Sequence, residues 1–459
     1  MELLLSSVAI FLMVVGVFYL IRLKGFYLLH PVRVLRSMGR EQAGSGISPF
    51  RAMTMALAGT LGVGNIVGVA SALYLGGAGA VFWMVTASLI AMVLKYAEIV
   101  LAMRHRRYAA DGEPYGGATY YIEDGCTQAG HPGWGRGLAV LFAVLCIFNA
   151  IGVGNILQVN AVAGACVGAF SVPPLLVGIV LGLFCFVVMC GGAKRISALT
   201  EKLVPFMMVV FLILSVAVLI LRRERIGNAL LLVVTDAFTV DSVLFGGLGF
   251  LLSRGVRYGV MRGILSNEAG CGTSPMAHAS AHTRSAAVQG MWGLVEVFLD
   301  TVVLCTVTAL VILVSDTGAA SGGENAIYTA QLAFTSVLGE WAGGLFAIAV
   351  LLFGIATVIC WSHYGMTCVA YLAGTHAAVA QRIFTVCYGL AVVYGAVAAP
   401  SVVWTLADIV IAFMTILNLL VLVGMHKEVE AETRVWSNAF PKKEKLSKKG
   451  THAPRNGIE

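Results

Sequence analysis

Long apolar runs separated by short polar segments are the main pattern of this chain of 459 residues. A membrane-spanning helix needs roughly 20 mostly apolar residues. The runs of this kind lie near residues 3–21, 50–75, 79–102, 138–168, 173–191, 203–221, 243–272, 288–314, 341–361, 383–399 and 402–424. The pattern therefore predicts an all-α integral membrane protein with about eleven transmembrane helices.

The seventh run is ambiguous because Arg254, Arg257 and Arg262 interrupt it. One interpretation is a span from about 243 to 265. The other places an outer surface helix up to about Leu252 and a span from about 253 to 285. We favour the second interpretation because it makes the two halves of the chain match, as described below.

Composition supports the membrane class and excludes others. The chain is 59% hydrophobic and only 12% charged, with 53 glycines and a mean hydropathy of +0.89. Soluble domains average about 25% charged residues. Nucleic-acid binders carry a basic face on a soluble fold, which this composition does not allow. We therefore expect a lipid bilayer, and no nucleic acid, as a partner.

Basic residues indicate the orientation. Most Lys and Arg residues fall in the connecting segments 22–49, 103–137, 192–202 and 362–382 and in the tail from 425. Cytoplasmic loops are rich in Lys and Arg, so we expect an N-terminus outside and a cytoplasmic C-terminus, in the plasma (inner) membrane. The tail from His426 is polar, and we expect it to be disordered. We favour a role as a topology marker over binding of anionic lipid.

Glycine clusters predict two interruptions in the helices. Residues 58–68 read Ala-Gly-Thr-Leu-Gly-Val-Gly-Asn-Ile-Val-Gly, and residues 266–275 read Ser-Asn-Glu-Ala-Gly-Cys-Gly-Thr-Ser-Pro. Backbone can unwind at membrane depth only where it is buried in protein or lines a wet cavity. Such breaks offer free N–H groups to an anion and free carbonyls to a cation. Close helix packing alone is the alternative for an isolated cluster.

Two breaks five spans apart predict an inverted repeat. Spans separated by five run in opposite directions, so spans 2–6 and 7–11 would form two related units. We expect an N-terminal extra helix with a basic inner loop (1–49), a first repeat (50–221), an outer connection (222–242), a second repeat (243–424) and a tail (425–459). This is a 5+5 inverted repeat preceded by one extra N-terminal helix, the architecture of a secondary transporter.

Several motifs together resemble those of a known family. They are Gly62-Val63-Gly64-Asn65-Ile66, the stretch from Gly76 to Met84, Lys95-Tyr96-Ala97-Glu98, Gly154-Asn155 with Gln158 and Asn160, Arg262-Gly263, Ser266 to Gly270, and Trp361-Ser362 with Tyr364-Gly365. The chain from about Ser48 to Gly424 resembles the alanine/glycine:cation symporter (sodium:alanine symporter) family, which is similar to the leucine-transporter-type fold.

The resemblance implies a set of binding residues. A substrate carboxylate would be held by the N–H groups of Val63 and Gly64. The amino-acid pocket would also include Gln158, Asn160, Ser266, Asn267, Gly270 and Trp361. One sodium ion would be bound by the carbonyls of Ala58, Leu61 and Gly354 and the hydroxyl of Thr357. A second cation site would use the Thr60 carbonyl, the Asn65 side chain and Ser266. Oxygen ligands of this kind suit a hard cation.

Other polar residues in the spans allow alternatives. Lys95 and Glu98 lie three apart on one helical face and are expected to form a structural ion pair. Glu296 and Asp300 could relay protons, or could instead make satisfied contacts with neighbouring helices. The His278/His282 spacing permits a zinc site but lacks a metalloprotease motif, so we favour an amphipathic gate helix.

The sequence thus predicts a sodium-driven symporter of a small neutral amino acid, alanine or glycine, working by alternating access. No cofactor is expected other than the co-transported sodium ion. A proton-coupled permease of the same fold is the nearest alternative. An integral-membrane enzyme is less favoured, because no paired acid/base or metal groups with suitable spacing are present. A channel is disfavoured, because no selectivity-filter sequence is visible.

Overall fold

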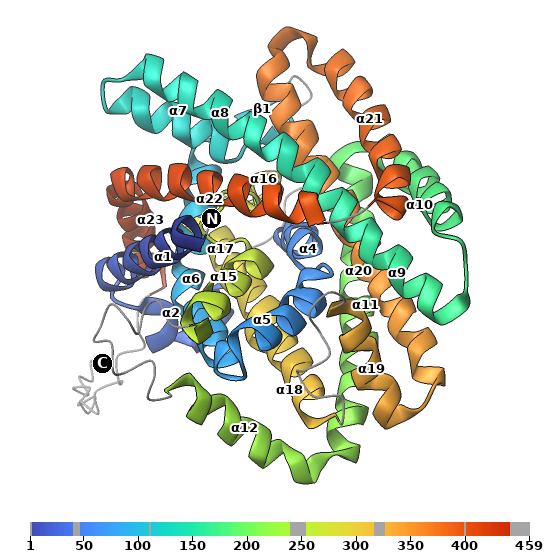
Figure 1. The fold of residues 1–459 in the computed structure, drawn as a ribbon. Helices are drawn as coiled ribbons and strands as arrows, with labels where there is room; N and C mark the ends of the chain where they lie inside the picture. The colour runs from blue at the N-terminus through green and yellow to red at the C-terminus, as the bar shows by residue number, and fades with distance from the viewer. Residues whose placement is uncertain are drawn as a thin grey trace, which may run out of the picture.

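The computed structural model describes residues 2–39, 46–109, 112–238, 254–315, 326–398 and 401–440, and most of these residues are helical (Figure 1). The helices of the first half are α1 (Glu2–Arg22), α2 (Phe26–Leu29), α3 (Pro31–Met38), α4 (Pro49–Thr60), η1 (Gly64–Gly68), α5 (Val69–Gly76), α6 (Gly79–Arg104), α7 (Ala118–Gln128), α8 (Pro132–Ile151), η2 (Gly152–Leu157), α9 (Gln158–Phe170), α10 (Pro174–Met189), α11 (Gly192–Leu221) and α12 (Arg223–Ala237). Those of the second half are α15 (Arg254–Asn267), α16 (Pro275–His278), α17 (Ala286–Val297), η3 (Phe298–Cys305), α18 (Thr306–Val314), α19 (Ala326–Leu338), α20 (Trp341–Ala373), η5 (Gly374–His376), α21 (Ala377–Val397), α22 (Ser401–Gly424) and α23 (His426–Ala439).

The described strands form one small hairpin between α6 and α7. β1 (Arg107–Tyr108) pairs antiparallel with β2 (Pro114–Tyr115), so that Arg107 lies opposite Tyr115. The all-α prediction is therefore confirmed apart from this short extramembrane pair.

Every apolar run predicted to span the membrane contains helix. Seven helical stretches of the described residues are long and apolar enough to cross a membrane, and the pair α4 and α5 makes an eighth if it is counted as one bent span. One of these stretches, 341–397, contains both α20 and α21, and α10 is shorter than the others. The class of a multi-span helical membrane protein is thus confirmed, while the number eleven stays a prediction.

The seventh run is helical from Arg254, the first described residue after the gap. The outer surface helix that we favoured for residues up to Leu252 lies outside the described residues. The span then continues from α15 through an irregular segment to the short α16. The division of the chain into two repeats is not tested by these elements and stays a prediction.

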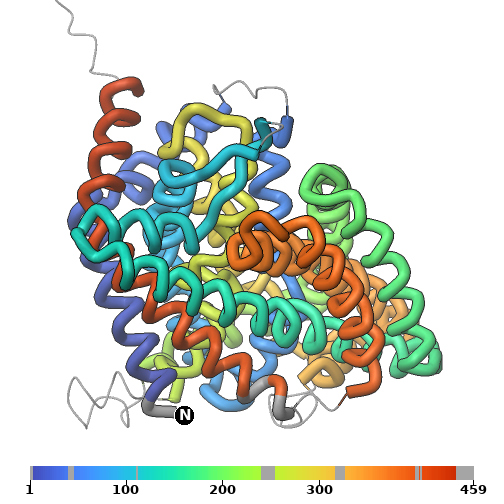
Figure 2. The backbone as a smooth tube through the Cα atoms, turned by 90° about the horizontal axis from the view of Figure 1, so that it is seen from above, coloured from blue at the N-terminus to red at the C-terminus, as the bar shows by residue number. Residues whose placement is uncertain are grey.

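The basic connecting segments lie together at one end of the bundle. Contacts between them join Arg22 to Glu430, Arg104 to Glu432, Lys194 to Glu113 and Tyr371 to Glu123. Figure 2 shows the start of the chain at the edge of the molecule opposite the one where α23 emerges. This grouping agrees with the prediction that these segments lie on the same side of the membrane.

The segment after the last span is a helix over part of its length, so the prediction of a disordered tail from His426 was wrong there. Val429, Thr433 and Trp436 of α23 are spaced four and three apart and are buried, which is the pattern of an amphipathic helix. The hydroxyl groups of Tyr96 and Thr433 are 2.8 Å apart and tie α23 to α6. Because the segment is mostly polar, its composition did not reveal this narrow apolar stripe.

The two interrupted helices lie at the centre of the bundle. α15 packs against α5, η1 and α6, and α16 packs against α4 and α6. In Figure 1, α5 and α15 run side by side in front of α17 and α18. The outer helix α12 crosses the lower edge, where the Asp236 carboxylate accepts a hydrogen bond from the Gly79 amide at 2.6 Å. The chain therefore surrounds its two irregular segments with continuous helices.

Candidate functional site

The first break falls between α4 and η1, at residues 61–63. α4 begins regularly, since the Ser48 side chain accepts a hydrogen bond from the Arg51 amide and Pro49 is its first residue. It ends at Thr60, and the axis then turns by 53°. The Gly62 amide bonds to the Thr60 carbonyl at 2.8 Å and to the Asn65 side chain at 3.1 Å. The predicted interruption is present, and the Asn65 side chain stabilises the conformation of the backbone there.

Position 62 requires glycine because of a close approach, whereas position 64 lies beside open space. A Cβ at Gly62 would lie 2.7 Å from Gln158 Oε1 and 2.9 Å from Thr357 Oγ1. A Cβ at Gly64 would meet no atom within 4 Å. Gly64 is therefore beside a space that the surrounding helices leave unfilled, as a substrate position at this break would require.

Gln158 contacts the first break directly. Its Oε1 accepts a hydrogen bond from the Val63 amide at 3.0 Å, and its Nε2 donates to the Val153 carbonyl at 3.2 Å. Val63 and Gln158 are both buried. The structure thus brings together two of the residues predicted to bind substrate, and an oxygen atom fits in front of the Val63 N–H.

The opposite side of the first break is covered by α20. The Thr357 hydroxyl lies 3.2 Å from the Leu61 carbonyl and 3.0 Å from the Phe353 carbonyl, and Trp361 Nε1 donates to the Gly59 carbonyl at 3.2 Å. Thr357 and Trp361 lie four apart, so they share the face of α20 that packs on α4. Two predicted sodium ligands, Leu61 and Thr357, are therefore neighbours.

The remaining predicted sodium ligands lie on the same two helices. Ala58 is fully buried in α4, one turn before Leu61. Gly354 lies one turn before Thr357 in α20, where a side chain would collide with Val162 of α9. These placements are compatible with one oxygen-lined site between α4 and α20.

A second polar cluster joins the first break to α15 and η3. Asn65 Nδ2 lies 3.0 Å from Ser266 Oγ and 2.8 Å from Asp300 Oδ1, and Ser266 Oγ lies 2.7 Å from Asp300 Oδ2. Thr60 is one turn away, with its carbonyl turned into the first break. Asn65 and Ser266, both predicted for a second cation site, are therefore adjacent.

The sequence analysis did not place Asp300, which belongs to this cluster, in the second cation site. It was expected either to relay protons or to make contacts between helices, and it does contact both interrupted helices. Its carboxylate is fully buried and also accepts a hydrogen bond from Thr301 at 2.7 Å. The signal in the sequence was a carboxylate inside an apolar run, which defaults to a functional role.

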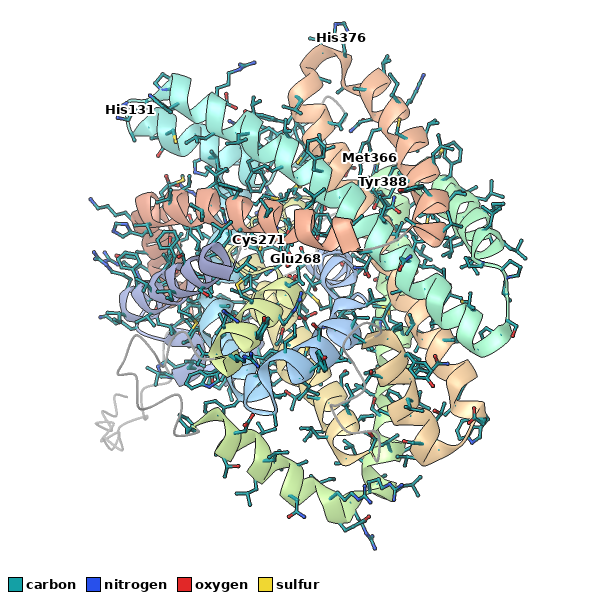
Figure 3. The ribbon with its side chains drawn as sticks, in the orientation of Figure 1. His131, Glu268, Cys271, Met366, His376 and Tyr388 are labelled. Carbon is teal, nitrogen blue, oxygen red and sulfur yellow. The ribbon has the colours of Figure 1, made fainter. Side chains whose placement is uncertain are left out.

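The second break lies between α15 and α16 and has strained backbone. Glu268, Gly270 and Gly272 all have positive φ, at 53°, 85° and 78°. A non-glycine residue in this region costs roughly 1–2 kcal/mol, so Glu268 is held there by its surroundings. Figure 3 shows Glu268 and Cys271 near the middle of the molecule, whereas His131 and His376 lie at its edge. The predicted interruption at 266–275 is thus present.

Asn267 and Gly270 face away from the first break. Asn267 Nδ2 donates to Ser88 of α6 and Thr301 of η3, at 3.2 and 3.1 Å. The Gly270 carbonyl accepts from Asn418 of α22 at 2.9 Å, and a side chain at Gly270 would meet Leu12 of α1. Both residues brace the second break, and the structure does not bring them to the Val63 region.

Asn160 also lies elsewhere. Its side-chain amide donates to the Ala398 carbonyl at 2.7 Å and to the Gly395 carbonyl at 3.3 Å, at the end of α21. Asn160 is two residues after Gln158 in α9, so its side chain lies on a different face of the helix. In this structure Asn160 therefore anchors α21 and does not contact the first break.

The buried lysine pairs with a different acid from the one expected. Lys95 Nζ lies 3.3 Å from Glu296 Oε1, and both side chains are 0% exposed. Glu98, the expected partner, instead accepts hydrogen bonds from the Gly272 amide and Asn418. Lys95 and Glu98 do share a helical face, but the second break passes over that face and supplies closer partners.

His278 and His282 do not form an amphipathic helix. α16 ends at His278, which is fully buried between Glu296 and Gln289, at 2.9 and 2.7 Å. His282 lies beyond the helix and receives a hydrogen bond from the Ile47 amide. No group of three or more His, Cys, Asp or Glu side chains within the described ranges could hold a metal ion.

Comparison with known proteins identifies the relatives of this chain. Residues 2–450 match the sequence profile described as the sodium:alanine symporter family. The chain is 36% identical over 429 residues to the sodium/alanine symporter AgcS of Methanococcus maripaludis, covering 92% of each protein. It is 35% identical over 419 residues to the probable sodium/glutamine symporter GlnT of Bacillus subtilis, covering 90% of this chain and 84% of the relative.

A solved structure shares the fold. The crystal structure of MhsT in complex with L-phenylalanine superposes with a TM-score of 0.50 at 14% identity, covering 87% of this chain and 95% of MhsT. This likeness concerns the fold alone, and it agrees with the leucine-transporter-type architecture expected from the motifs.

Proposed function

Because the chain belongs to the sodium:alanine symporter family, a family of membrane transporters, we propose that it carries alanine or glycine across the membrane together with Na⁺ by alternating access. The observation that carries the proposal is the arrangement around the first break. One side of this break presents the Val63 amide to an oxygen atom, and the other side places the Leu61 carbonyl against Thr357. Substrate and ion would thus bind within a few residues of each other.

The substrate carboxylate would bind at Val63 and Gly64. The first turn of a helix offers unpaired N–H groups and a positive dipole end, which stabilise an anion. An oxygen already lies 3.0 Å from the Val63 amide, and the space beside Gly64 is open. A carboxylate oxygen would replace Gln158 Oε1 and release that side chain to contact the rest of the ligand.

Sodium would bind between α4 and α20. Carbonyls of Ala58, Leu61 and Gly354 and the Thr357 hydroxyl are neutral oxygen donors, which suit a hard monovalent cation without a buried protein charge. Leu61 O and Thr357 Oγ1, now 3.2 Å apart, would each turn toward the ion. A second cation would bind at Thr60, Asn65 and Ser266, with the Asp300 carboxylate as an additional ligand that the motifs did not assign.

The proposed sodium and substrate positions share the backbone around the first break, and this would couple the binding of one ligand to the binding of the other. Sodium would fix the end of α4 against α20, and this ordering places the next amides, at 63 and 64, for the carboxylate. Each ligand then increases the affinity for the other by the same factor. We propose that Gln158 and the buried ring of Trp361 bound the substrate position.

Proton coupling through Asp300 is the second candidate function. A fully buried carboxylate that contacts Asn65 and Ser266 from both interrupted helices could carry a proton in place of a second Na⁺. Family membership favours sodium. We propose further that the N-terminus lies outside and the C-terminus in the cytoplasm of a cell whose inner membrane holds the protein.

Uptake into proteoliposomes tests this function. Labelled alanine and glycine are presented under an imposed Na⁺ gradient and, separately, under an imposed pH gradient without Na⁺. We expect accumulation with the Na⁺ gradient and little with the pH gradient, and excess glutamine should compete poorly. Accumulation that follows pH and ignores Na⁺ would support the proton-coupled alternative. Uptake of neither amino acid would contradict the proposed substrate class.

A further inference from the structure

A cavity of about 510 Å³ lies where the first span meets the inner-end helices. Its wall is formed by the last residues of α1, by α2 and α3, and by α23, all at the end of the bundle that carries the basic segments. None of the residues proposed for substrate or sodium belongs to it. Because α1 is a candidate membrane span ending at Arg22, this cavity lies at the level where a bilayer meets water.

The cavity is positively charged. Arg22, Lys24, Arg33 and Arg434 line it, against one carboxylate, Glu430. Arg22 and Arg434 both approach Glu430, at 3.7 and 3.4 Å. Lys24 and Arg33 form no ion pair with any carboxylate of the described chain. Two of the four cations therefore have no counter-ion within this part of the structure.

Two donors in the wall are buried without an acceptor. The Trp436 side chain is 3% exposed, and its Nε1 has no hydrogen-bond partner among the described residues; Arg33 Nε is in the same state. The Arg33 guanidinium lies 4.6 Å from the Trp436 ring and donates through Nη2 to the Ser437 carbonyl, so its position is fixed. Buried donors are rarely left unpaired, and both side chains line the cavity that an anion would enter.

The exposed apolar side chains of α1–α3, called the rim below, lie on the same helices as the cavity wall, and Leu29 belongs to both. Ile21, Leu28, Leu29, Val32 and Leu35 are between 51% and 71% exposed. Apolar side chains next to basic ones are typical of helices that lie at the boundary between headgroups and acyl chains. A free inorganic anion would make no use of this rim, whereas acyl chains would cover it.

We propose that this cavity binds the phosphate headgroup of an anionic phospholipid, with Lys24, Arg33 and Trp436 Nε1 as its donors and the exposed side chains of α1–α3 along its acyl chains. Basic clusters at the cytoplasmic end of a span attract anionic lipid. Such a lipid would join α3 to α23, which itself contacts α6 through Tyr96. The inference depends on the proposed function only for placing this end in the inner leaflet.

Lipid binding to the full-length protein, purified in detergent, tests the inference. The probes are phosphatidylglycerol, phosphatidylcholine and inorganic phosphate, with bound lipid counted by native mass spectrometry. The test variants are the double variant Lys24→Ala/Arg33→Ala and Trp436→Phe, which keeps the ring and removes the N–H. Lys427→Ala is the matched control, because it removes an exposed charge from the same helix outside the cavity.

We expect wild-type protein to bind phosphatidylglycerol about tenfold more tightly than phosphatidylcholine, and the double variant to lose this preference. Trp436→Phe should weaken phosphatidylglycerol binding several-fold, and Lys427→Ala should behave as wild type. Inorganic phosphate should not displace the lipid. Equal binding of the two lipids, an unaffected double variant, an equally impaired Lys427→Ala, or displacement by stoichiometric phosphate would each overturn the proposal.

The proposal can fail independently of the transport function. Binding is measured without substrate or ion gradient, so loss of alanine uptake leaves the lipid result unchanged. The comparison of the two lipids on wild-type protein needs no variant and therefore remains decisive even where the double variant does not fold.

Discussion

The amide nitrogen of Val63, in the first break, and the side-chain oxygen of Gln158, the first residue of α9, lie 3.0 Å apart, although the two residues are 95 positions apart. This contact closes the first break from the side of α9, while Thr357 closes it from the side of α20. The unwound backbone is thus held from both sides by neutral polar groups. An ion or a substrate that binds here must exchange places with one of them.

Replacing Gln158 by Glu should weaken substrate binding. The Glu side chain can still accept a hydrogen bond from the Val63 amide, but it places a negative charge where the substrate carboxylate is expected. We predict a loss of alanine affinity of about tenfold or more, since like charges at this distance repel strongly in a low dielectric. Alanine binding by scintillation proximity measures it. Gln331→Glu in α19 is the control, and an unchanged affinity in folded Gln158→Glu protein would count against the proposed carboxylate position.

Gly64→Ala should block substrate and leave the fold intact. The added methyl would meet no protein atom within 4 Å, so it would project into the space proposed for the ligand. Gly68→Ala is the matched control, because its methyl also meets nothing within 4 Å and lies one turn further along. We expect at least a tenfold rise in the KM for alanine in Gly64→Ala only. Equal uptake by the two variants would show that the open space is not the substrate site.

The variant Asp300→Asn should distinguish coupling to Na⁺ from coupling to protons. The substitution keeps the size of the side chain and removes the charge beside Asn65 and Ser266. In the sodium account, the apparent Na⁺ affinity and the steepness of the Na⁺ dependence of uptake both decrease. In the proton account, the wild type accumulates alanine with a pH gradient alone and the variant does not.

The control for Asp300 is Cys305→Ser, a neutral change in the same cluster, where Cys305 Sγ lies 3.3 Å from Ser266 Oγ. It should retain the Na⁺ dependence of the wild type. If Asp300→Asn also retains it, and no pH-driven uptake is found, then Asp300 has no role in coupling and serves only to hold the two breaks together.

Lys95→Met should destabilise the protein more than the double variant Lys95→Met/Glu296→Gln. The single change leaves the carboxylate of Glu296 buried without its cation, which costs about 3–5 kcal/mol, whereas the double change removes both charges. Thermal unfolding in detergent, followed by tryptophan fluorescence, compares the two variants. A double variant no more stable than the single one would mean that the buried carboxylate of Glu296 does not need Lys95 as its counter-ion.

The positions of the helices and of both breaks could be predicted from the sequence, because each depends on local composition. Apolar length decides where a helix crosses the membrane, and clustered glycines decide where it is interrupted. The pairing of Lys95 with Glu296 could not be predicted, since helical spacing relates residues of one helix only. The separation of Asn160 from Gln158 could have been predicted, because residues two apart in one helix lie on different faces.

The amphipathic α23 was missed for a different reason. Its apolar positions Val429, Thr433 and Trp436 are few among charged residues, so composition suggested a solvated tail. The contacts of Asp300 were only half predicted: contacts with neighbouring helices were one of the two alternatives, but its neighbours come from two other segments of the chain. Local sequence patterns do not reveal tertiary contacts of this kind.

The Na⁺ dependence of alanine uptake by Thr357 variants tests the central claim most directly. Thr357→Ala removes the hydroxyl that lies 3.2 Å from the Leu61 carbonyl, whereas Thr357→Ser keeps it. Loss of one ligand to a charged group costs about 1.5–3 kcal/mol, or roughly a tenfold change or more in apparent Na⁺ affinity. We predict this loss for Thr357→Ala and near wild-type affinity for Thr357→Ser. Unchanged Na⁺ affinity in Thr357→Ala would contradict a sodium site between α4 and α20.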